Sequence, residues 1–480
     1  MKLPGRKTRI VCTIGPASDS PEVMEQLLLA GMDVARLNFS HGAFEYHRRI
    51  IDNLRNASSG TGRRLAIMAD LPGPKMRIGS VAGEPLQLRA GDPFTLTTDD
   101  IVGDGTRASV SFPRLPASVR PGNTLFLNDG IIRLEVEEVR GSDVACRVAA
   151  GGELRSRKGL NVPGVDLGID AFTERDHECL RFALERGVDA VSQSFVASAE
   201  DLHAVRRAAR ALGRDPFLVA KIERAVALDR IDGILAAADG IMVARGDLGV
   251  EIPIERIAIE QKRLVRRANL LGKPVITATQ MLESMTENAR PTRAEATDVS
   301  NAVIDGTDCV MLSGESAMGK YPVEAVRTLA RIAEAAEPHR AGQFVREAMK
   351  AVIDSGNVAP SDLIAMSIEN ILSRMSVAAV VVPTRTGSTA RQLARLRLPV
   401  WITAAATREE TCQGLQFSYG IHPEKVEAAP ADWRSWARGW VAEKSVPGDY
   451  LILYEGPSPD HPDVAQRIEV VDLRGRPGIS

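Results

Sequence analysis

The stretch FLVAKIERAV, residues 217–226, begins like a buried β-strand and then carries charged residues where the strand should end. Side chains alternate between the faces of a strand, so Phe217, Val219, Lys221 and Glu223 share one face. Burying an ammonium and a carboxylate there is costly unless something else lies between them. A metal ion with an anionic substrate would fit, and so would a plain ion pair at the strand end. This window alone does not decide between them.

Seven other runs repeat the same β-rich character, and helix-like stretches such as PEVMEQLLLAG (21–31) separate most of them. Strands that alternate with helices predict a parallel sheet, and eight such units predict a (β/α)8 TIM barrel with its site at the carboxyl ends of the strands. An open doubly wound sheet is the alternative, and the lack of a glycine-rich fingerprint after the first run argues against it. The eight runs are 9–15, 33–39, 64–70, 188–195, 217–223, 240–246, 273–280 and 308–314.

One gap in this series is too long for a single strand–helix connection. It separates Asp70 from Val188, and it contains short alternating runs such as LQLRAGDPFTLTT and DVACRVAAGGEL, punctuated by turn residues. The pattern predicts a small β-barrel or sandwich inserted after the third barrel strand. We expect this β lid domain at 72–165 and the catalytic barrel at 1–71 and 166–342. A domain that leaves the barrel there could close over the site.

The remaining residues, 343–480, change character again. PSDLIAMSIENILSRM is typical of an amphipathic helix, and VAAVVVPT, PVWITAAA and GDYLILYEG are typical of buried strands. This region is predicted to be a C-terminal α/β domain with an open sheet, in a regulatory role.

Charge and cysteine usage limit the classes of partner. The 480 residues carry 60 Lys+Arg against 62 Asp+Glu, a net charge of -2, which gives no reason to expect nucleic acid or an anionic membrane. No apolar run is long enough to span a bilayer, and no signal-peptide core precedes the first strand. The five cysteines lack any CxxC spacing, so we expect buried thiols in a reducing cytoplasm: Cys12, Cys146, Cys179, Cys309 and Cys412.

Polar side chains end most of the predicted barrel strands. The carboxyl ends of barrel strands meet at one rim, so these groups should converge there, which is the arrangement of an active site. They are Arg36, Asn38 and Ser40 on the second strand, Asp70 on the third, Lys221 and Glu223 on the fifth, Arg245 and Asp247 after the sixth, Thr277 and Thr279 on the seventh, and Ser313 and Glu315 after the eighth.

The chemistry of this set favours an anionic substrate held with Mg²⁺. Glu223 and Asp247 offer hard oxygen ligands from adjacent strands, with water and substrate oxygens left to complete an octahedron. Lys221 adds a point charge, and Arg36 a fork suited to phosphate or carboxylate. Such a set serves phosphoryl transfer, and it would equally stabilise an enolate. The chain has no P-loop, so a nucleotide must be held in another way.

At this point the sequence resembles the pyruvate kinase family over most of its length. The motifs that carry the resemblance occur in order: RKTRIVCTIGPAS, ARLNFSHG, FLVAKIE, MVARGDLGVEIP, TATQMLESM and RPTRAEATDVSNAVIDGTDCVMLSGESAMGKYPVEAV. The resemblance implies a barrel with a β lid and a C-terminal regulatory domain. It also implies a homotetramer that converts phosphoenolpyruvate and ADP, with Mg²⁺, to pyruvate and ATP.

The resemblance further implies a role for each matched residue. Glu223 and Asp247 would hold Mg²⁺, Lys221 would neutralise the transferred phosphoryl group and the enolate, and Arg36 would bind the substrate phosphate. The Gly246 backbone and the Thr279 hydroxyl would hold the substrate carboxylate, with Thr279 near the path that protonates the enolate. The nucleotide would face Asn38, Phe39, Ser40, His41, Arg77 and, from the lid, Lys158.

One departure from the family lies beside its potassium site. The family holds this ion with the matches of Asn38, Ser40 and Asp70 and usually continues Thr-Lys-Gly-Pro-Glu-Ile-Arg-Thr, whereas this chain reads DLPGPKMRIG, with Lys75 in place of the glutamate. A fixed ammonium there could supply the charge that potassium brings. We therefore expect an enzyme that does not require potassium, with Lys75 as its internal cation. The alternative is a solvated loop lysine without consequence.

A second departure lies in the C-terminal domain. The loop Thr384–Thr389, followed by a helix, matches a family loop that binds a sugar-phosphate effector. The tail EGPSPDHPDVAQRIEVVDL lacks the usual glycine-rich effector lid, so a sugar-phosphate or nucleotide effector and an ordinary strand–helix loop both stay open. The loop residues are Thr384, Arg385, Thr386, Gly387, Ser388 and Thr389. The segment DWRSWARGW spaces Trp433, Trp436 and Trp440 as on a helix, which favours core or interface packing.

Two other function classes remain as alternatives. A Mg²⁺-dependent aldolase or lyase acting on a pyruvate enolate would share Glu223 and Asp247 but would not need a lid with Lys158. A non-catalytic regulator on the same scaffold would have lost one or more of four residues, and all four are present: Lys221, Glu223, Asp247 and Thr279.

Overall fold

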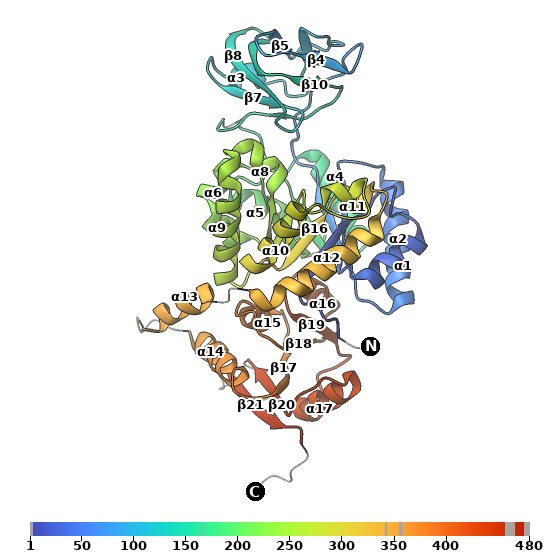
Figure 1. The fold of residues 1–480 in the computed structure, drawn as a ribbon, viewed down its shortest axis with the longest axis vertical. Helices are drawn as coiled ribbons and strands as arrows, with labels where there is room; N and C mark the ends of the chain where they lie inside the picture. The colour runs from blue at the N-terminus through green and yellow to red at the C-terminus, as the bar shows by residue number, and fades with distance from the viewer. Residues whose placement is uncertain (1–2, 166, 341–342, 355–358, 457–465, 475–480) are drawn as a thin grey trace.

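The computed structural model describes residues 3–165, 167–340, 343–354, 359–456 and 466–474. Three bodies follow one another along the longest axis, with a β domain at one end, a barrel in the middle and an α/β domain at the other end (Figure 1). The expected boundaries at residues 166 and 342 lie outside the described residues.

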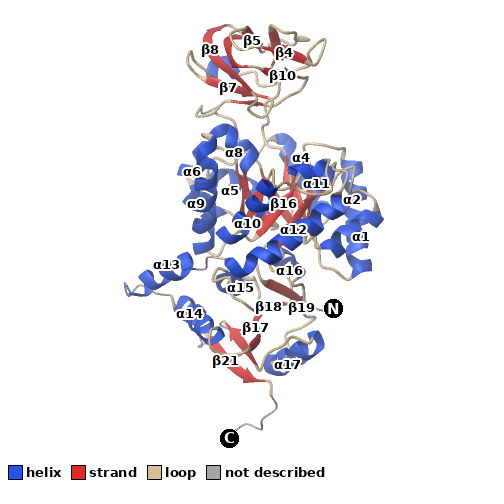
Figure 2. Ribbon diagram, in the orientation of Figure 1, coloured by secondary structure: helices blue, strands red, loops and turns tan. Residues whose placement is uncertain are grey.

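The middle body is a closed barrel of parallel strands, as the sequence predicts. Each apolar run forms one strand, and helices surround the strands (Figure 2). The inner face is filled by side chains such as Val11, Val219 and Met242, and Phe417 from the C-terminal body closes one end by stacking on Phe217 with centroids 4.9 Å apart. In their order around the barrel the strands are β1 (Arg9–Thr13), β2 (Val34–Asn38), β3 (Ala66–Leu71), β12 (Ala190–Gln193), β13 (Phe217–Ile222), β14 (Gly240–Ala244), β15 (Val275–Ala278) and β16 (Cys309–Leu312).

The helices around the barrel bury their apolar faces against the strands in one large core. Local sequence fixes where several begin: Thr173 and Thr292 form capping boxes with Asp176 and Glu295. The helices are α1 (Pro21–Ala30), α2 (Phe44–Thr61), α4 (Glu174–Glu185), α5 (Ala199–Ala211), α6 (Ala225–Asp229), α7 (Ile231–Ala237), α8 (Arg245–Glu251), α9 (Ile257–Leu270), α10 (Arg293–Asp305), α11 (Gly314–Ala317) and α12 (Pro322–Ala336).

The inserted domain, called the lid below, consists of the strands between β3 and α4 with their loops. Six strands form one sheet in the order β11-β7-β8-β9-β5-β6, and β10 pairs with β4 in a second. One hydrophobic core, including Phe94, Leu125 and Leu134, joins them. The lid elements are β4 (Leu86–Leu88), β5 (Pro93–Thr97), β6 (Arg107–Ser109), α3 (Leu115–Ser118), β7 (Thr124–Leu127), β8 (Ile132–Arg140), β9 (Asp143–Ala150), β10 (Gly152–Leu154) and β11 (Leu160–Asn161).

The C-terminal body is an α/β domain with an open five-stranded sheet in the order β19-β18-β17-β20-β21, in which only β21 is antiparallel. Trp440 is buried in its core and Trp433 and Trp436 pack against it, so the tryptophans are packing residues, as expected. The elements are α13 (Gln343–Asp354), α14 (Pro360–Leu372), β17 (Val377–Pro383), α15 (Ser388–Ala394), β18 (Trp401–Ala406), α16 (Glu409–Leu415), β19 (Ile421–Lys425), α17 (Trp433–Lys444), β20 (Tyr450–Glu455) and β21 (Arg467–Asp472).

Candidate active site

The barrel rim that faces the lid gathers the polar residues that end its strands. Lys221 is the penultimate residue of β13, and Glu223 is the first residue after that strand. Asp247 lies in the first turn of α8, which follows the next strand around the barrel. Glu223, Asp247 and Phe195 line a cleft with lid residues such as Leu160. The strand ends therefore meet at the base of the lid, as barrel topology dictates.

Lys221 lies among acidic groups without a close hydrogen bond to any of them. Its Nζ is 3.6 Å from Asp70 Oδ1 and 3.3 Å from Glu223 Oε2, while its hydrogen bond goes to Ser194 Oγ at 2.6 Å. Burial alone would lower the pKa of Lys221, but the carboxylates of Asp70 and Glu223 outweigh that cost and raise it. Lys221 therefore remains an ammonium at neutral pH.

Glu223 is one of the most deeply buried acids of the rim, at 2 % exposure. The backbone N–H of Phe195 donates to its Oε1 at 2.6 Å, and its Oε2 has no hydrogen-bond partner. Burial raises the pKa of Glu223, Lys221 opposes the rise, and the nearby Asp247 carboxylate adds to it. Two acids that repel one another beside an ammonium favour binding of a further cation.

Arg36 belongs to the same cluster through Asp70. Its Nε donates to Asp70 Oδ2 at 2.9 Å, its Nη2 pairs with the same oxygen, and its Nη1 donates to Thr13 Oγ1 at 2.8 Å. Ser192 Oγ donates to the other oxygen, Asp70 Oδ1, at 2.6 Å. Burial would raise the pKa of Asp70, but Arg36 and Lys221 hold it below its usual value. Asp70 thus stays ionised and orients the Arg36 fork.

Thr279 sits on strained backbone at the end of β15. Thr279 and Gln280 have φ of 67° and 53°, a left-handed conformation that side chains with a Cβ rarely adopt. Gly246 N donates to Thr279 Oγ1 at 2.8 Å, and the Arg245 guanidinium donates to the carbonyls of Ala278 at 3.1 Å and Thr279 at 2.7 Å. These contacts hold the threonine hydroxyl beside the first turn of α8.

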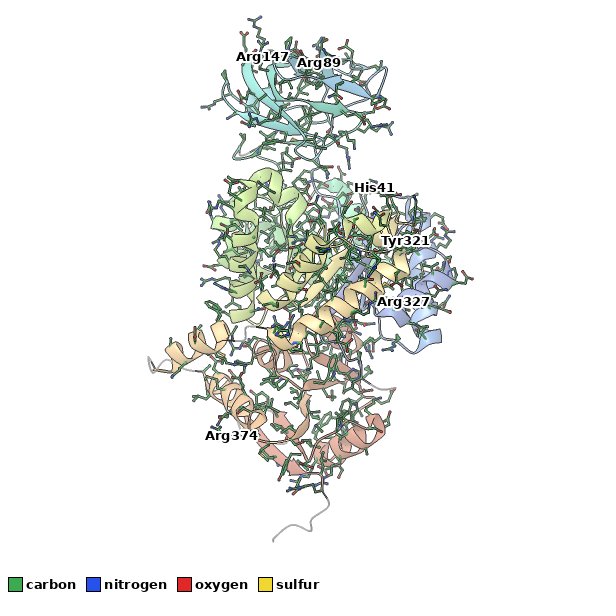
Figure 3. All side chains as sticks on the ribbon, viewed as in Figure 1. His41, Arg89, Arg147, Tyr321, Arg327 and Arg374 are labelled. Atoms are coloured by element: carbon green, nitrogen blue, oxygen red, sulfur yellow. The ribbon has the colours of Figure 1, made fainter. Side chains whose placement is uncertain are left out.

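The residues expected at the nucleotide divide into two groups. His41 and Ser40 are exposed at the lid-facing end of the barrel, where Figure 3 labels His41, and Asn38 Oδ1 accepts from Ser40 N at 3.1 Å. Burial lowers the pKa of His41, and the positive charges of Arg77, Lys75 and Arg36 lower it further. Phe39, in contrast, is 4 % exposed and stacks on His47, so its side chain is a packing group.

The lid contributes the backbone that carries Arg77 and Lys158. The two segments are bonded to one another, since Ile78 N donates to Lys158 O at 2.9 Å and Arg77 bridges to Gly159. Both side chains are partly exposed. Among the sequence-predicted site residues, these two therefore belong to the lid.

Lys75 lies between the lid and the barrel. Its Nζ is 3.8 Å from Asp247 Oδ1, and its side chain is 33 % exposed. It also lies near His41, whose pKa it lowers. The structure therefore places the ammonium beside the acid of α8, whereas Asp70 pairs with Arg36 and Lys221.

A divalent cation with oxygen ligands fits the carboxylates of Glu223 and Asp247. The buried, unpartnered Oε2 of Glu223 is the kind of atom that a metal ion satisfies. In the part of the chain that the structure describes, no group of three or more His, Cys, Asp or Glu side chains is arranged as a metal site. The expectation is two carboxylates, with water and substrate oxygens as the other ligands.

The segment Thr384–Thr389 follows β17 and includes the first two residues of α15, Ser388 and Thr389. Gly387 adopts φ of 80° and donates its N–H to Thr384 Oγ1 at 2.9 Å, and Arg391 Nη2 donates to Thr386 O at 2.9 Å. The loop is thus tied to itself. Its predicted effector function stays a prediction, and residues 457–465 of the tail that lacks the usual effector lid lie outside the described residues.

Sequence reasoning missed the contribution of the strand end at β12. Ser192, Ser194 and the Phe195 amide bond Asp70, Lys221 and Glu223 respectively. The signal was present in VSQSF, where three consecutive polar residues, Ser192, Gln193 and Ser194, end an apolar strand. Short hydroxyl side chains are so common in strands that the pattern alone did not single them out.

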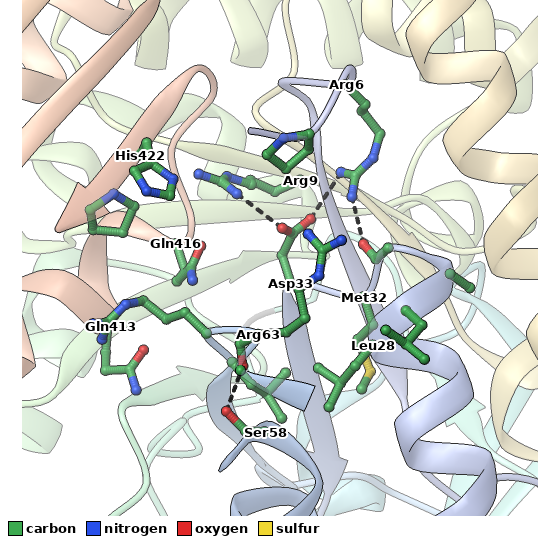
Figure 4. A pocket seen from close by; sticks show the side chains of 18 of the residues that line it. Arg6, Arg9, Leu28, Met32, Asp33, Ser58, Arg63, Gln413, Gln416 and His422 are labelled. Atoms are coloured by element: carbon green, nitrogen blue, oxygen red, sulfur yellow. Dashed lines mark hydrogen bonds and ion pairs between the residues drawn. The ribbon is translucent and has the colours of Figure 1, made fainter. Parts of the chain in front are cut away.

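A larger cavity, of about 550 Å³, lies at the opposite end of the barrel, against the C-terminal body. Figure 4 shows Arg6 and Arg9 both directed at Asp33 there. Arg6 Nη1 lies 2.9 Å from Asp33 Oδ2, and Arg9 Nη1 lies 2.9 Å from Asp33 Oδ1. Arg9 Nε also donates to Ser418 O at 3.3 Å. These charges are paired, and they join the barrel to the C-terminal domain.

Comparison with known proteins agrees with the fold and with the motifs. A family model described as pyruvate kinase, barrel domain, matches residues 5–326, and one described as pyruvate kinase, alpha/beta domain, matches residues 362–456. The chain belongs to the pyruvate kinase family. The pyruvate kinase of Thermococcus litoralis is 48 % identical over 88 % of this chain and 89 % of its own length.

Further relatives of the pyruvate kinase family extend the match. The pyruvate kinase of Geobacillus stearothermophilus is 43 % identical over 88 % of this chain and 72 % of its own length. The crystal structure of a pyruvate kinase from Cryptosporidium parvum superposes with a TM-score of 0.89 at 34 % identity, covering 98 % of this chain and 96 % of the other. Membership implies a phosphotransferase that uses a divalent cation, with phosphoenolpyruvate and ADP as substrates. A search of the described helices found none long and apolar enough to cross a membrane.

Proposed function

We propose that this protein transfers the phosphoryl group of phosphoenolpyruvate to ADP, giving pyruvate and ATP, with Mg²⁺ as its divalent cation. The observation that carries the proposal is the convergence of Lys221, Glu223 and Asp247 at the rim beneath the lid. Phosphoryl transfer depends mainly on positioning and on neutralising negative charge. An ammonium held among carboxylates, with one carboxylate oxygen unpartnered, supplies both.

The substrate phosphate belongs near Arg36 and Lys221 in this proposal. Arg36 is held by Asp70 and Thr13, so its planar fork is oriented before substrate binds. Lys221 stays protonated because two carboxylates face it. It can therefore neutralise the phosphoryl group during transfer and the enolate oxygen left behind.

Glu223 and Asp247 would hold the Mg²⁺. When bound, the ion would neutralise phosphate charge and align the substrate oxygens. The ADP phosphates would approach from the side of Asn38, Ser40, His41, Arg77 and Lys158, of which the last two come from the lid region. A lid that carries nucleotide-binding side chains would exclude water when it closes.

Thr279 is proposed to bind the substrate carboxylate with the Gly246 amide and to lie on the path by which the enolate gains its proton. The support is geometric, because the hydroxyl and the amide already lie 2.8 Å apart at one point of the rim. The left-handed backbone at Thr279 costs free energy, and such strain clusters at functional sites.

We further propose that Lys75 removes the need for potassium. Its ammonium lies 3.8 Å from Asp247 and acts electrostatically on His41, so a fixed positive charge already stands at the edge of the site. Lys75→Glu should then make activity dependent on potassium. A variant that stays fully active in tetramethylammonium buffer without potassium would refute this role for Lys75.

We also propose an assembly, a compartment and a mode of regulation. The family resemblance favours a homotetramer, and the five free, buried cysteines agree with a reducing cytoplasm. A sugar-phosphate or nucleotide effector at Thr384–Thr389 would be tested by its effect on the substrate concentration for half-maximal rate. No change with either class of effector would leave this segment an ordinary loop.

The decisive experiment measures initial rates of pyruvate formation from phosphoenolpyruvate, ADP and Mg²⁺, with and without potassium. Equal, substantial rates support the reaction and the role of Lys75. Rates only with potassium support the reaction and exclude that role. No pyruvate from folded protein under either condition, with and without candidate effectors, would refute the proposed reaction, and turnover of a pyruvate aldol adduct would then identify a lyase.

A further inference from the structure

The end of strand β12 touches each of the three charged side chains at the centre of the rim. Ser192 Oγ donates to Asp70 Oδ1, Ser194 Oγ accepts from Lys221 Nζ, and Phe195 N donates to Glu223 Oε1, each at 2.6 Å. We propose that the segment Ser192–Phe195, here called the β12 clamp, presets these charges, and that Ser194 is the residue that positions the Lys221 ammonium for phosphoryl transfer. The inference rests on the proposed function.

Ser194 has the geometry of a fixed acceptor. It is 2 % exposed, and its own hydroxyl proton is committed to Leu71 O at 2.7 Å. With that proton engaged, an oxygen lone pair of Ser194 faces the lysine. The neighbouring strands are in register at Gln193 and Ala220, which brings Ser194 alongside Lys221. A hydroxyl that is buried and committed in this way cannot rotate away from its partner.

Without Ser194, Lys221 would lose its hydrogen bond to that hydroxyl and could close on Glu223 or on Asp70, which lies 3.6 Å away. The gap between Lys221 Nζ and Glu223 Oε2 is 3.3 Å and is not a hydrogen bond, because Oε2 has no hydrogen-bond partner. A direct bond would satisfy both buried charges at once. It would also occupy the ammonium that the phosphoryl group needs and the oxygen that the cation needs. Ser194 therefore keeps the two groups apart and available.

Phe195 holds the other member of the pair. Its backbone is left-handed, with φ of 59°, which is uncommon for an aromatic residue. The left-handed φ turns the chain after Phe195 away from the strand direction, while the Phe195 amide donates to Glu223. Gly73 packs closely here, because a Cβ at that position would come within 2.8 Å of the Phe195 ring. Adjacent residues of one turn thus fix the ammonium and the carboxylate separately.

The test compares Ser194→Ala with Ser316→Ala. Ser316 is a matched control, since it is also a fully buried rim serine whose hydroxyl donates to a backbone carbonyl, that of Thr13 at 2.8 Å. Loss of a hydrogen bond to a charged group should lower the kcat of Ser194→Ala by about 10- to 100-fold. The KM for phosphoenolpyruvate should change little, and Ser316→Ala should keep its kcat. Ser194→Thr, which retains a hydroxyl, should recover most of the rate.

A double-mutant cycle shows whether Ser194 acts through Lys221. In a Lys221→Arg background, Ser194→Ala should cost much less than in the native chain, because its target is already altered. Equal costs in both backgrounds, or equal falls in kcat for Ser194→Ala and Ser316→Ala, would overturn the inference. A native chain that forms no pyruvate would instead refute the proposed function. If Ser194→Thr does not fold, the double-mutant cycle still shows whether Ser194 acts through Lys221.

Discussion

The two ends of the barrel treat buried charge in opposite ways. At the end facing the C-terminal domain, Asp308 is 3 % exposed and fully satisfied. Its oxygens accept from Arg397 at 2.7 and 2.9 Å, from Tyr419 N at 2.9 Å and from Val275 N at 3.1 Å. At the lid-facing rim, Glu223 is as deeply buried, and its Oε2 faces Lys221 at 3.3 Å without a hydrogen-bond partner.

Backbone strain follows the same division. Three residues at or beside the rim adopt a left-handed backbone conformation although they are not glycine: Phe195, Thr279 and Gln280. Near the other end, Arg397 is also left-handed, and its guanidinium is bonded to Asp308 and to the carbonyl of Gly306, while its buried Nε has no hydrogen-bond partner. The two acids differ more clearly, because both Asp308 oxygens accept hydrogen bonds, whereas Glu223 Oε2 accepts none, as expected where a ligand completes the site. The rim is therefore the functional end and the other end the structural one.

The largest expected effect is a loss of activity when a charge is removed from the rim. Lys221→Met removes the ammonium that faces the transferred group, so kcat should fall by about 10³-fold, the upper range for deleting one electrostatic stabiliser. Stability should also fall, because the buried Glu223 carboxylate loses its counter-ion, so kcat is compared on folded protein. Steady-state rates with thermal melting provide the measurement.

Lys262→Met is the matched control for Lys221→Met, since Lys262 on α9 pairs with Asp305 away from the rim. It should keep its kcat. Full activity of Lys221→Met would show that the Lys221 ammonium is not needed for the reaction. The rim could then not be distinguished as the functional end of the barrel.

The second effect is a loss of stability when the buried acid at the other end of the barrel is removed. Asp308→Ala leaves Arg397 and two backbone N–H groups without their acceptor, so the free energy of unfolding should fall by about 3–5 kcal/mol. The kcat of the remaining folded protein should be retained. Urea denaturation followed by activity measurement tests both halves of this statement.

A surface acid provides the control for Asp308→Ala. Asp232 pairs with Arg267 at 2.7 Å, but both side chains are more than half exposed, so Asp232→Ala should cost less than about 1 kcal/mol. If the two variants lose the same stability, the buried network at Asp308 is not what joins the domains.

Much of this contrast could be predicted from the sequence, because it follows from topology. Eight apolar runs define the barrel, and the polar residues that end them must share a rim, so Lys221, Glu223, Asp247 and Thr279 were placed correctly at one end. Strand β19, IHPEK, was missed because a proline and two charged residues obscure its alternation. Strand β21 was missed because its sequence was considered only as part of a tail.

Contacts across strands could not be predicted, because they depend on register and on backbone conformation. Ser194 reaches Lys221 only because Gln193 pairs with Ala220. Nothing in SQSF signals that Phe195 is left-handed. Likewise, the sequence grouped Lys75 with Asp70, but the turn through Gly73, with φ of 64°, leads the lysine to Asp247.

The third effect is a dependence of stability on pH at the end of the barrel that faces the C-terminal domain. Glu424, beside the cavity of Figure 4, would have its pKa raised by burial, but bonds from His422 and Trp440 Nε1 and the charge of Lys444 lower it to about 2. A depressed carboxylate pKa stabilises the fold above its ordinary value of 4.5, and this stability is lost as pH falls from there toward 2. Glu424→Gln should therefore lose about 2 kcal/mol at neutral pH and less in acid.

Thermal melting across the acid range measures this difference. The Tm of the native chain should fall more steeply between about pH 5 and about pH 3 than that of Glu424→Gln. Glu427→Gln, at an exposed position three residues further on, is the control and should follow the native curve. Parallel curves for all three proteins would mean that Glu424 does not contribute to the structural end.

The smallest effect tests whether the rim stores strain. Gln280 is exposed and left-handed, and asparagine tolerates that conformation better than glutamine, so Gln280→Asn should stabilise the fold by roughly 0.5 kcal/mol. Gln87→Asn is the control, because Gln87 lies in strand β4, where asparagine is disfavoured and the change should have the opposite sign. Urea midpoints with equal slopes measure both. Destabilisation by both variants would show that the turn after Thr279 is relaxed, and then only the unpartnered charge would distinguish the rim from the opposite end.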